Sequence, residues 1–369
     1  MKTSPFRLTG RGADTNPRNR FSSTHSVPEP EDAAPPDLPP KTRFLRDTSR
    51  RVISCHHSPD LGYGATLNPY RGCEHGCVYC FARPTHEYLD RSAGLDFESV
   101  VFIKHDAARL LRRELGAPRW EPRTVAMCGV TDPYQPIERR RELTRECLKV
   151  FLEFRNPVTV TTKNQLVTRD RDILSALAGW NAAAVFISVT TLDEELCRRM
   201  EPRTSRPAHR LEAVKALAQA GIPVGVNVAP VIPGLTDHEL PAILKEAALA
   251  GAKYAWYAPV RLPYGVGELF ERWIEKYFPD RKNKILGRLR SLHGGKLNDS
   301  SFGARLRGRG VYADELEGLF RLSCRRLGLR DDGPALSAAS FRRPVGRQLA
   351  LFSGSASDSG CPGDVEMIK

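Results

Sequence analysis

The sequence has no long hydrophobic run. None of its apolar stretches approaches the roughly 18 residues that would span a bilayer, and the mean hydropathy is -0.39. A membrane-spanning protein is therefore excluded, and no membrane partner is expected. Residues 1–10 carry the charges of a signal peptide, but no apolar stretch follows them. We therefore expect a cytoplasmic protein.

Two common motifs are also missing. No G-x-G-x-x-G follows the first expected strand, so a dinucleotide-binding fold has no direct support. No second C-x2-C pair occurs, whereas a structural zinc site usually takes its four ligands from two such pairs. Nine cysteines without an export signal also argue against a disulfide framework, and they favour metal or catalytic use of some thiols.

The basic residues are unevenly distributed. The 369 residues carry a net charge of +13, and the middle of the chain is nearly neutral. Residues 1–52 hold 10 basic and 6 acidic side chains, and residues 281–347 hold 16 and 6. A basic C-terminal block attracts a polyanion such as nucleic acid, but it is equally typical of a solvated charged face. Charge alone does not choose between these two interpretations.

Composition divides the chain into four parts. Residues 1–52 are rich in proline and poor in large apolar groups, which predicts a disordered leader. Residues 351–369 contain a Gly/Ser/Asp mixture and predict a disordered tail in which Cys361 is a free thiol. Between them we expect a catalytic domain over residues 53–262 and a basic C-terminal extension over residues 263–350.

Residues 53–262 alternate between strand and helix patterns. Strands are expected over residues 64–69, 124–130, 158–162, 185–191, 223–230 and 254–262. Helical spacing follows over residues 144–154, 170–178, 207–220 and 237–250, with Pro207 at a first turn and Gly221 and Gly251 as stops. Six repeated βα units predict an α/β fold, namely a partial (β/α)6 TIM-like barrel, with a doubly wound sheet as the alternative.

Three cysteines lie within eight residues. Cys73, Cys77 and Cys80 form a C-x3-C-x2-C run with two glycines, at the place of the first expected loop after a strand. Thiolates are ligands for zinc or iron–sulfur clusters. A zinc site would need a fourth ligand, which could be His75, His86 or Cys55. Three thiolates would instead bind three irons of a cubane cluster. The fourth iron would then keep a coordination position without a protein ligand, as is usual in catalytic metal centres.

The spacing resembles the signature of radical S-adenosylmethionine (SAM) enzymes. Residues 68–77 (NPYRGCEHGC) and 131–138 (TDPYQPIE) are similar to bacterial radical SAM proteins grouped with spore photoproduct lyase, often labelled DNA repair photolyases. The likeness covers about residues 62–262, and the partial barrel is the fold of that superfamily. The resemblance implies a [4Fe-4S] cluster on Cys73, Cys77 and Cys80, whose fourth iron is chelated by SAM.

The resemblance also implies an activity. A flavodoxin- or ferredoxin-type donor would reduce the cluster, SAM would be cleaved reductively, and a 5'-deoxyadenosyl radical would abstract hydrogen from the substrate. We expect a lyase-like enzyme acting on nucleic acid, such as a DNA lesion. A radical SAM enzyme that modifies a peptide, an RNA base or a small metabolite is a second hypothesis. A non-catalytic nucleic-acid-binding protein with a structural metal is a third.

Further site residues follow from the resemblance. Tyr79 matches the aromatic position just before the last cysteine of the family's motif, and the residues around that position pack on the adenine of SAM in relatives. Lys163 follows the third strand, where relatives hold SAM with a lysine. Ser188 matches a position that meets the nucleoside. Arg203 is a candidate clamp for the SAM carboxylate through its planar fork, with an ion pair to Glu201 as the alternative.

The end of the second strand supplies three more candidates. Thr131 and Asp132 are expected near the SAM amino group, although Asp132 is also a plausible turn cap. Cys128 lies where spore photoproduct lyases use a cysteine to return hydrogen to the repaired thymine, and small buried cysteines also commonly fill strands. Cys147 and Cys197 lie on helical patterns and are interpreted as core residues.

Two later strands and the basic block complete the candidates. Asn227 and Tyr257 are expected to face the barrel mouth, whereas Trp256 is interpreted as core. The basic residues 281–309, with Tyr277, Phe278 and Phe302 among them, predict either a phosphate-tracking surface with aromatic stacking or a solvated cap over the barrel.

Overall fold

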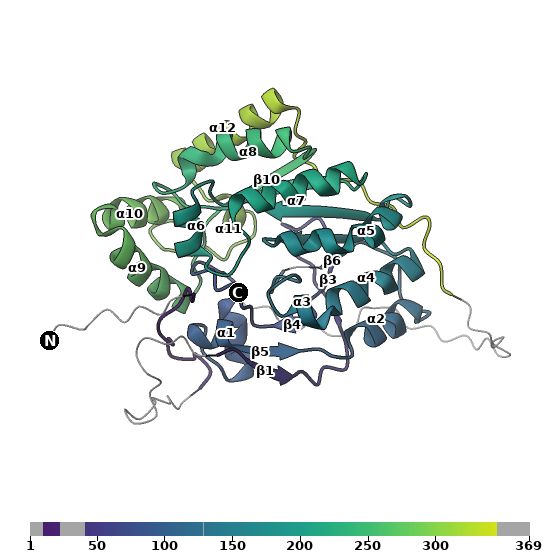
Figure 1. Cartoon of the computed structure of the whole chain (residues 1–369). Helices are drawn as coiled ribbons and strands as arrows, with labels where there is room; N and C mark the ends of the chain where they lie inside the picture. Colours follow the sequence, from purple (N-terminus) through teal and green to yellow (C-terminus); the bar gives the residue numbers. More distant parts are fainter. Residues whose placement is uncertain (1–9, 23–40, 128, 345–369) are drawn as a thin grey trace.

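The structure is a computed structural model that describes residues 10–22, 41–127 and 129–344 (Figure 1). Its main sheet has seven strands in the order β10-β9-β8-β7-β6-β3-β2. These strands are β2 (Ile53–Cys55), β3 (Ala65–Leu67), β6 (Val125–Met127), β7 (Val158–Thr162), β8 (Ala183–Ser188), β9 (Val224–Val231) and β10 (Tyr254–Pro259). All neighbours are parallel except β2, which pairs antiparallel with β3.

The strand order decides between the two expected folds. From β3 to β10 each parallel strand lies beside the strand that precedes it in the chain, so the order never reverses. A doubly wound sheet would contain such a reversal at its switch point. The six parallel strands therefore confirm the predicted partial (β/α)6 barrel.

Helices cover the outer face of the barrel strands (Figure 1). The crossover helices are α2 (Ala107–Gly116), α4 (Leu143–Phe154), α5 (Arg171–Ala178), α6 (Glu194–Met200), α7 (Pro207–Gln219) and α8 (Leu240–Leu249), with short turns α3 (Glu138–Arg141), η2 (Gln165–Asp170) and η3 (Asp237–Glu239). Leucines of α2, α4, α5, α7 and α8 share one apolar core with the strands. The helices predicted over residues 144–154, 170–178, 207–220 and 237–250 are confirmed, since the apolar spacing that predicted them is the face that packs on the sheet.

Successive side chains of β9 and β10 point alternately toward the helices and toward the barrel interior. Val226, Val228 and Tyr257 belong to the apolar core under the helices, and the Tyr257 ring lies 4.6 Å from the Phe320 ring. Tyr257 therefore does not face the barrel mouth, contrary to the prediction. Trp256, one residue before it, points to the opposite face and is 38% exposed, so its interpretation as core is also wrong.

A second, three-stranded sheet lies beside the barrel. It has the order β1-β5-β4, from β1 (Arg43–Arg46), β5 (Val100–Ile103) and β4 (Tyr70–Arg71), and it is joined by η1 (Arg83–Leu89) and α1 (Leu95–Ser99). The predicted disorder of residues 1–52 is wrong for residues 10–22 and 41–52, which the structure describes. Composition missed their order because much of it comes from backbone pairing and from hydrogen bonds to the buried Glu98 carboxylate, which composition does not report. Residues 1–9 and 23–40 lie outside the described residues.

The C-terminal extension is helical up to residue 327. It contains α9 (Gly265–Tyr277), η4 (Pro279–Arg281), α10 (Lys282–Leu292), α11 (Ala304–Arg307) and α12 (Val311–Leu327). Leu316, Phe320 and Cys324 of α12 join the barrel core, and α12 lies beside α8. The extension is therefore packed on the barrel and not detached from it. The predicted tail, including Cys361, lies outside the described residues.

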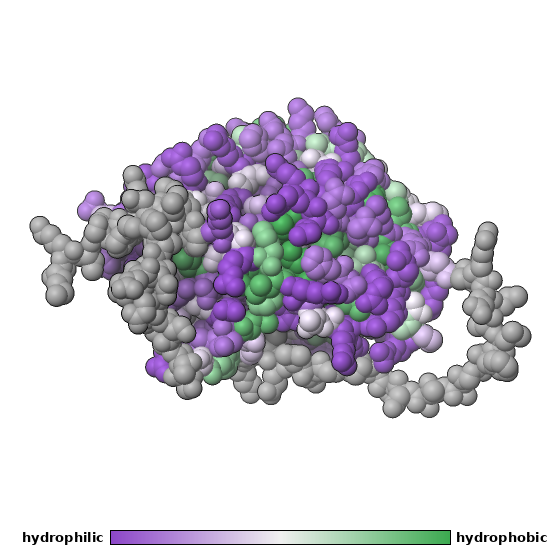
Figure 2. Space-filling view, turned by 60° about the horizontal axis from the view of Figure 1, so that its bottom comes forward, coloured by the Kyte–Doolittle hydropathy of each residue, from purple (hydrophilic) through white to green (hydrophobic). Residues whose placement is uncertain are grey.

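The surface is mostly hydrophilic. On the face in Figure 2, hydrophobic residues form a band across the centre, and hydrophilic residues border it. Among the described residues, no helix is both long enough and apolar enough to cross a membrane.

Candidate functional site

The three clustered cysteines lie on the loop after β4, close to the carboxyl end of the first parallel strand. Active groups of βα barrels sit at this end of the strands. Cys73 and Cys77 are buried, Cys80 is partly buried, and all three thiols are free. The Cys73 amide donates to the Phe97 carbonyl at 2.8 Å, and the Cys80 amide donates to the Cys77 carbonyl at 3.2 Å. The loop therefore has a fixed backbone path.

Two glycines allow this path. Gly72 has φ +79°, and a Cβ there would lie 2.8 Å from the Val100 carbonyl oxygen. Gly76 has φ +67°, and its neighbouring space is filled by the Glu98 carboxylate and by Gly12. Because side chains are strained at positive φ and would collide here, both positions require glycine.

A buried ion pair holds the backbone of the cysteine loop in place. Arg83 and Glu98 are both fully buried, and Arg83 Nη2 donates to Glu98 Oε1 at 2.7 Å. Arg83 Nε also donates to the Cys77 carbonyl at 3.0 Å. The same Glu98 carboxylate accepts from the amides of Gly12 and Ala13 at 3.0 and 2.8 Å. Glu98 thus ties the N-terminal segment, residues 10–13, to the cysteine loop.

The thiols lie within electrostatic reach of one another. Burial, and then Glu201, raise the pKa of Cys77 well above its ordinary value, and Cys80 and Cys73 raise it further. Burial also raises the pKa of Cys80, against the opposing effects of Arg83 and Lys163. Three thiolates in such a place need a compensating positive charge, and the iron ions of a cluster would supply it. The donor set therefore fits an iron–sulfur cluster.

The two histidines suggested as a fourth zinc ligand have different surroundings. His75 Nδ1 lies 3.3 Å from Asp132 Oδ2, and its Nε2 lies 3.3 Å from the Asn164 amide nitrogen. His86 is fully buried, with its ring edge-on to Phe97 and Phe102. Among the described residues, no three His, Cys, Asp or Glu side chains are arranged to hold a single metal ion.

Asp132 connects the cysteine loop to the next two strands. Its Oδ1 accepts from Thr162 Oγ1 at 2.6 Å, and its Oδ2 accepts from the Lys163 amide at 2.8 Å. Burial alone would raise the pKa of Asp132, but His75 and these donors lower it to about 2. Burial alone would lower the pKa of His75, but Asp132 and then Cys73 raise it to about 10. The carboxylate is thus engaged within the protein, as expected of a turn cap.

Tyr79 belongs to a second buried network. Its hydroxyl donates to Glu201, which is also ion-paired with the fully buried Arg210 and accepts from Thr190 Oγ1 at 2.9 Å. Arg210 in turn donates to the Ser188 carbonyl at 3.0 Å. The Tyr79 hydroxyl is therefore occupied, and its ring lies in an apolar cluster with Leu196 and Met200.

The remaining predicted residues lie around the loop. Arg203 donates to Glu74 Oε1 at 3.2 Å and to the Gly10 carbonyl at 3.1 Å, so its ion-pair partner is Glu74 and not the predicted Glu201. Thr131 is buried and donates from its hydroxyl to the Tyr70 carbonyl at 3.0 Å. Cys128 lies outside the described residues. Cys147 and Cys197 are buried on α4 and α6, as predicted.

Lys163 differs from these engaged side chains. It follows β7, and it is close enough to Cys77 and Cys80 to lower the pKa of both thiols. Its ammonium group makes no hydrogen bond or ion pair with the described part of the chain. A free cation beside the thiols is therefore available to an anionic group.

The strand register brings three side chains into one row. Ser188 on β8 pairs with Asn227 on β9, which pairs with Trp256 on β10. Since Val226, Val228 and Tyr257 occupy the opposite face, this row faces the barrel interior. Asn227 therefore faces inward, as predicted, and Trp256 is a site candidate that sequence reasoning missed.

Sequence reasoning missed one cation–aromatic pair, formed by Phe81 and Arg261, whereas Phe302 was expected as a stacking residue of the basic block. The Arg261 guanidinium lies 4.4 Å from the Phe81 ring, and that of Arg305 lies 4.7 Å from the Phe302 ring. The two rings are 46% and 61% exposed. Burial and then Arg305 lower the pKa of Arg261 to about 10, whereas Cys80 acts in the opposite direction. The position of Phe81 directly after Cys80 was the one available sequence signal.

Arg261 and Arg305 differ in their partners. Arg305 donates to Asp60 at 2.5 Å and to the Ser58 hydroxyl, which fixes its orientation. Arg261 makes no ion pair or hydrogen bond with the described residues, although it lies two residues after β10. The expected stacking residues Tyr277 and Phe278 instead pack against Trp273, so they are not free to stack on a ligand.

Solved structures show the same fold. Spore photoproduct lyase complexed with dinucleoside spore photoproduct has a TM-score of 0.54 and 18% identity, over 78% of this chain and 81% of that one. A variant of that lyase with bound AdoMet and the dinucleoside matches with the same TM-score and identity.

Sequence comparisons identify relatives. Uncharacterised proteins of Mycobacterium bovis and Mycobacterium tuberculosis are 37% identical over 235 residues, which is 63% of this chain and 68% of each relative. The radical SAM Nalpha-GlyT isomerase of Pseudomonas phage M6 is 20% identical over 67% of this chain and 50% of its own. Residues 67–247, which include the cysteine loop and the four barrel strands β6 to β9, match the Radical SAM superfamily. The chain belongs to the radical SAM superfamily.

Proposed function

We propose that this protein is a radical SAM enzyme that acts on a nucleic-acid substrate, with Cys73, Cys77 and Cys80 as the ligands of a [4Fe-4S] cluster. Membership of the superfamily implies the cluster and SAM as cofactors. When bound, these groups supply a 5'-deoxyadenosyl radical that abstracts a hydrogen atom from the substrate. The buried, mutually close free thiols support the assignment of the ligands.

The surrounding residues would position SAM. Lys163 is the strongest candidate for the SAM carboxylate because it has no partner among the described residues and lies beside the thiols. Ser188 begins the inward row that continues through Asn227 and would meet the nucleoside. The Tyr79 ring, fixed through its hydroxyl, would pack near the adenine.

Three further candidates would act through other groups. Asp132 already accepts bonds from Thr162 and Lys163, so we assign it the role of holding the loop and not of receiving the SAM amino group. Thr131 would assist from the same turn through its contact with the Tyr70 carbonyl. Arg203 could clamp a carboxylate only by leaving Glu74.

The observation that carries the nucleic-acid substrate is the pair of exposed rings beside Cys80. Nucleobases stack on aromatic rings, and arginines neutralise phosphates. Phe81 with Arg261 presents both features next to the proposed cluster, and Phe302 adds a second exposed ring, over which Arg305 is held by Asp60. The solved lyase with a dinucleoside substrate supports the same substrate class, although the likeness in sequence is low. The finer assignment is a lyase that acts on a DNA lesion.

The proposed reaction needs a source of electrons for the cluster and a source of hydrogen for the substrate radical. A flavodoxin- or ferredoxin-type donor would reduce the cluster. Cys128 would return hydrogen to the substrate radical, in which case Cys128→Ala still cleaves SAM but yields an aberrant product. An unchanged product profile would dispose of that role.

Cofactor chemistry is tested by anaerobic reconstitution with iron and sulfide, followed by dithionite and SAM. We expect 5'-deoxyadenosine from the wild type and none from a Cys73/Cys77/Cys80→Ala variant. A verified four-iron cluster without nucleoside would contradict the proposal, and zinc without a cluster would favour a structural metal.

Substrate class is tested by the binding of labelled single-stranded and duplex DNA at several salt concentrations. Binding should weaken steeply with salt, and Phe81→Ala should weaken it roughly tenfold, since base stacking contributes about 1–3 kcal/mol per base. Trp180→Ala is the matched control because Trp180 is also an exposed ring under an arginine, Arg155, but lies between α5 and β8, at the opposite end of the strands. Equal losses in the two variants would refute the stacking surface.

A further inference from the structure

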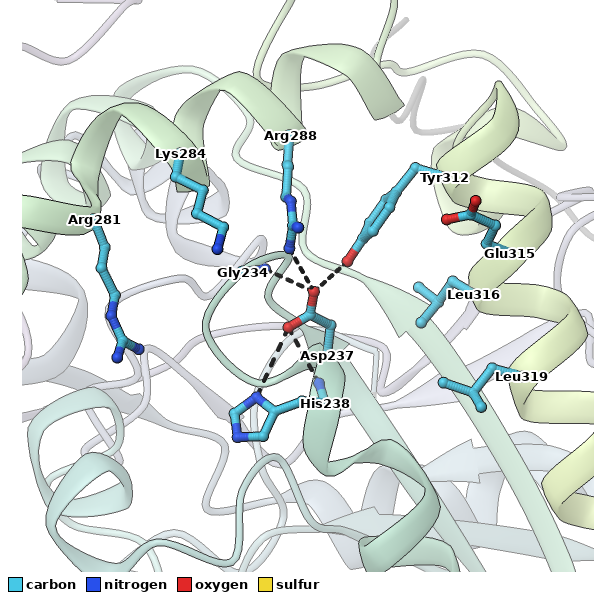
Figure 3. Close-up of a pocket in the computed structure, with 10 residues that line it drawn as sticks. All are labelled: Gly234, Asp237, His238, Arg281, Lys284, Arg288, Tyr312, Glu315, Leu316 and Leu319. Atoms are coloured by element: carbon cyan, nitrogen blue, oxygen red, sulfur yellow. Dashed lines mark hydrogen bonds and ion pairs between the residues drawn. The ribbon is translucent and has the colours of Figure 1, made fainter.

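A cavity of about 580 Å³ lies between helix α10, helix α12 and the loop after β9 (Figure 3). One wall carries Arg281 from the turn before α10, Lys284 from its first turn and Arg288 from its middle. The other residues that line the cavity are Gly234, Asp237, His238, Tyr312, Glu315, Leu316 and Leu319. Neither the cofactor chemistry nor the rings beside Cys80 use this cavity.

One of the three cations is held in place by its neighbours. Asp237 Oδ2 accepts from Arg288 Nη1 at 3.1 Å, from the Gly234 amide at 2.8 Å and from the Tyr312 hydroxyl. These bonds meet at a single carboxylate in the middle of the cavity (Figure 3). Although burial opposes it, the donors lower the pKa of Asp237, so the carboxylate stays charged and keeps Arg288 oriented.

The other two cations are unpaired. Arg281 and Lys284 are exposed, and their side chains make no hydrogen bond or ion pair with the described residues. In Figure 3 both extend from the α10 side toward the loop, and no dashed line reaches them. The second carboxylate of the lining, Glu315, lies on the opposite wall on α12. Positive charge therefore exceeds negative charge, and it is concentrated on one side.

The placement of these cations is unfavourable without a ligand. The first turn of α10 contains no acidic residue, and the amino end of a helix is the positive end of its dipole. Basic side chains there repel each other and the helix end. A bound anion would relieve both repulsions, so the arrangement is typical of a site that binds one.

Helix α10 belongs to the same apolar cluster as the cysteine loop. Its residues Ile285, Leu286 and Leu289 are members of a cluster that also contains Cys77 and residues 78–79. The cationic side chains of α10 lie on the cavity side of the helix, and the helix with its side chains is about 10 Å wide. The cavity and the cysteine loop are therefore linked through the packing of helix α10.

We propose that this cavity binds a phosphate of the nucleic-acid strand whose base reacts at the cysteine loop. Arg281 and Lys284 contact the phosphate, and Arg288, oriented by Asp237, supplies a third set of donors. Arginine donors match phosphate geometry, and backbone phosphates dominate the affinity of proteins for nucleic acid. This assignment rests on the proposed function, since it adds a second contact for the same substrate.

The test compares two double variants that each remove two positive charges. Arg281→Gln/Lys284→Gln alters the cavity, and Lys215→Gln/Lys245→Gln alters exposed lysines of α7 and α8 that do not line it. Affinity for a labelled single-stranded oligonucleotide is measured at several salt concentrations. The cavity variant should bind roughly tenfold more weakly at low salt. Its slope of log affinity against log salt should fall by roughly 0.7, as for the loss of one phosphate contact on a single strand.

The outcomes separate the cavity from the proposed function. Equal slopes and affinities in the two double variants would overturn the cavity proposal while wild-type binding still supported a nucleic-acid substrate. A wild type that binds no nucleic acid would refute the proposed function itself. Titration with inorganic phosphate and pyrophosphate distinguishes the source of the phosphate. If the cavity variant lost binding of these anions but kept oligonucleotide affinity, the cavity would be assigned to a free phosphate compound and the backbone proposal overturned.

Discussion

The cysteine loop and the cationic cavity differ in how their charged groups are partnered. The charges that hold the loop backbone are paired inside the protein, as in Arg83 with Glu98 and His75 with Asp132, whereas Lys163 beside the thiols has no partner among the described residues. In the cavity, Arg281 and Lys284 have none among the described residues. Paired charges hold a fixed geometry for a cofactor, whereas unpaired charges remain available to a ligand that comes and goes. The comparison predicts that changes at the loop reduce stability or cofactor loading, and that changes at the cavity alter binding alone.

The largest effect is expected from removing one thiol. Cys77→Ala should reduce iron loading and lower 5'-deoxyadenosine formation to background, because a cluster held by two thiolates is not retained. Iron analysis and nucleoside assay after reconstitution give the result. Cys147→Ala, a buried helical cysteine outside the loop, is the control and should keep both. Full activity of Cys77→Ala would remove the thiol from the ligand set.

Breaking the buried ion pair under the loop should be the largest change in stability. Glu98→Gln leaves the Arg83 guanidinium buried without a counter-charge, which typically costs about 3–5 kcal/mol. Urea unfolding measures the loss. Glu153→Gln breaks the exposed Arg112 pair and should cost about 1 kcal/mol or less. Similar losses in the two variants would contradict the supporting role of Glu98.

A pH dependence should follow from His86. Burial lowers its pKa to about 4, below the 6.5 of an exposed histidine. The unfolded chain therefore binds more protons between these values, so the contribution of His86 is complete above pH 6.5 and is lost as the pH falls toward 4. At pH 5 the loss should be about 2 kcal/mol.

His86→Phe tests this dependence. Phenylalanine keeps an aromatic ring against Phe97 and Phe102 but does not titrate. Urea unfolding at pH 7 and pH 5 should show a smaller difference in the variant than in the wild type. An identical difference would show that His86 does not stay neutral in the folded protein.

A smaller effect is expected at Lys163. If its ammonium group holds the SAM carboxylate, Lys163→Gln should raise the SAM concentration for half-maximal nucleoside formation roughly tenfold, about 1.4 kcal/mol of binding. Iron content should stay at the wild-type level because no thiol is changed. Lys215→Gln is the charge-matched control. An unchanged half-maximal concentration would exclude the contact.

The smallest effect should come from the cavity in the absence of a ligand. Arg281→Gln/Lys284→Gln should leave the free energy of unfolding within about 0.5 kcal/mol of the wild type, as for ordinary surface substitutions. A loss above 2 kcal/mol in urea unfolding would mean that these cations support the fold, and the contrast with the cysteine loop would disappear.

The fold was predictable where the signal is local. Strand and helix patterns predicted all six barrel strands and four of the covering helices, because each buries one apolar face. The order of residues 10–22 was not predictable, since it depends on Glu98 about 85 positions away. Tyr257 and Trp256 were assigned to the wrong faces because a pattern with period two does not say which face meets the helices.

Spacing and residue type were enough to predict the thiol cluster and the βα repeat, because both features are local. Which charges are paired could be seen only in the folded protein. Arg203 meets Glu74 instead of Glu201, Arg305 meets Asp60, and Lys163 meets no partner among the described residues. The physical reason is that ion pairing depends on distances between segments remote in the chain, and the packing of helices on the barrel sets those distances.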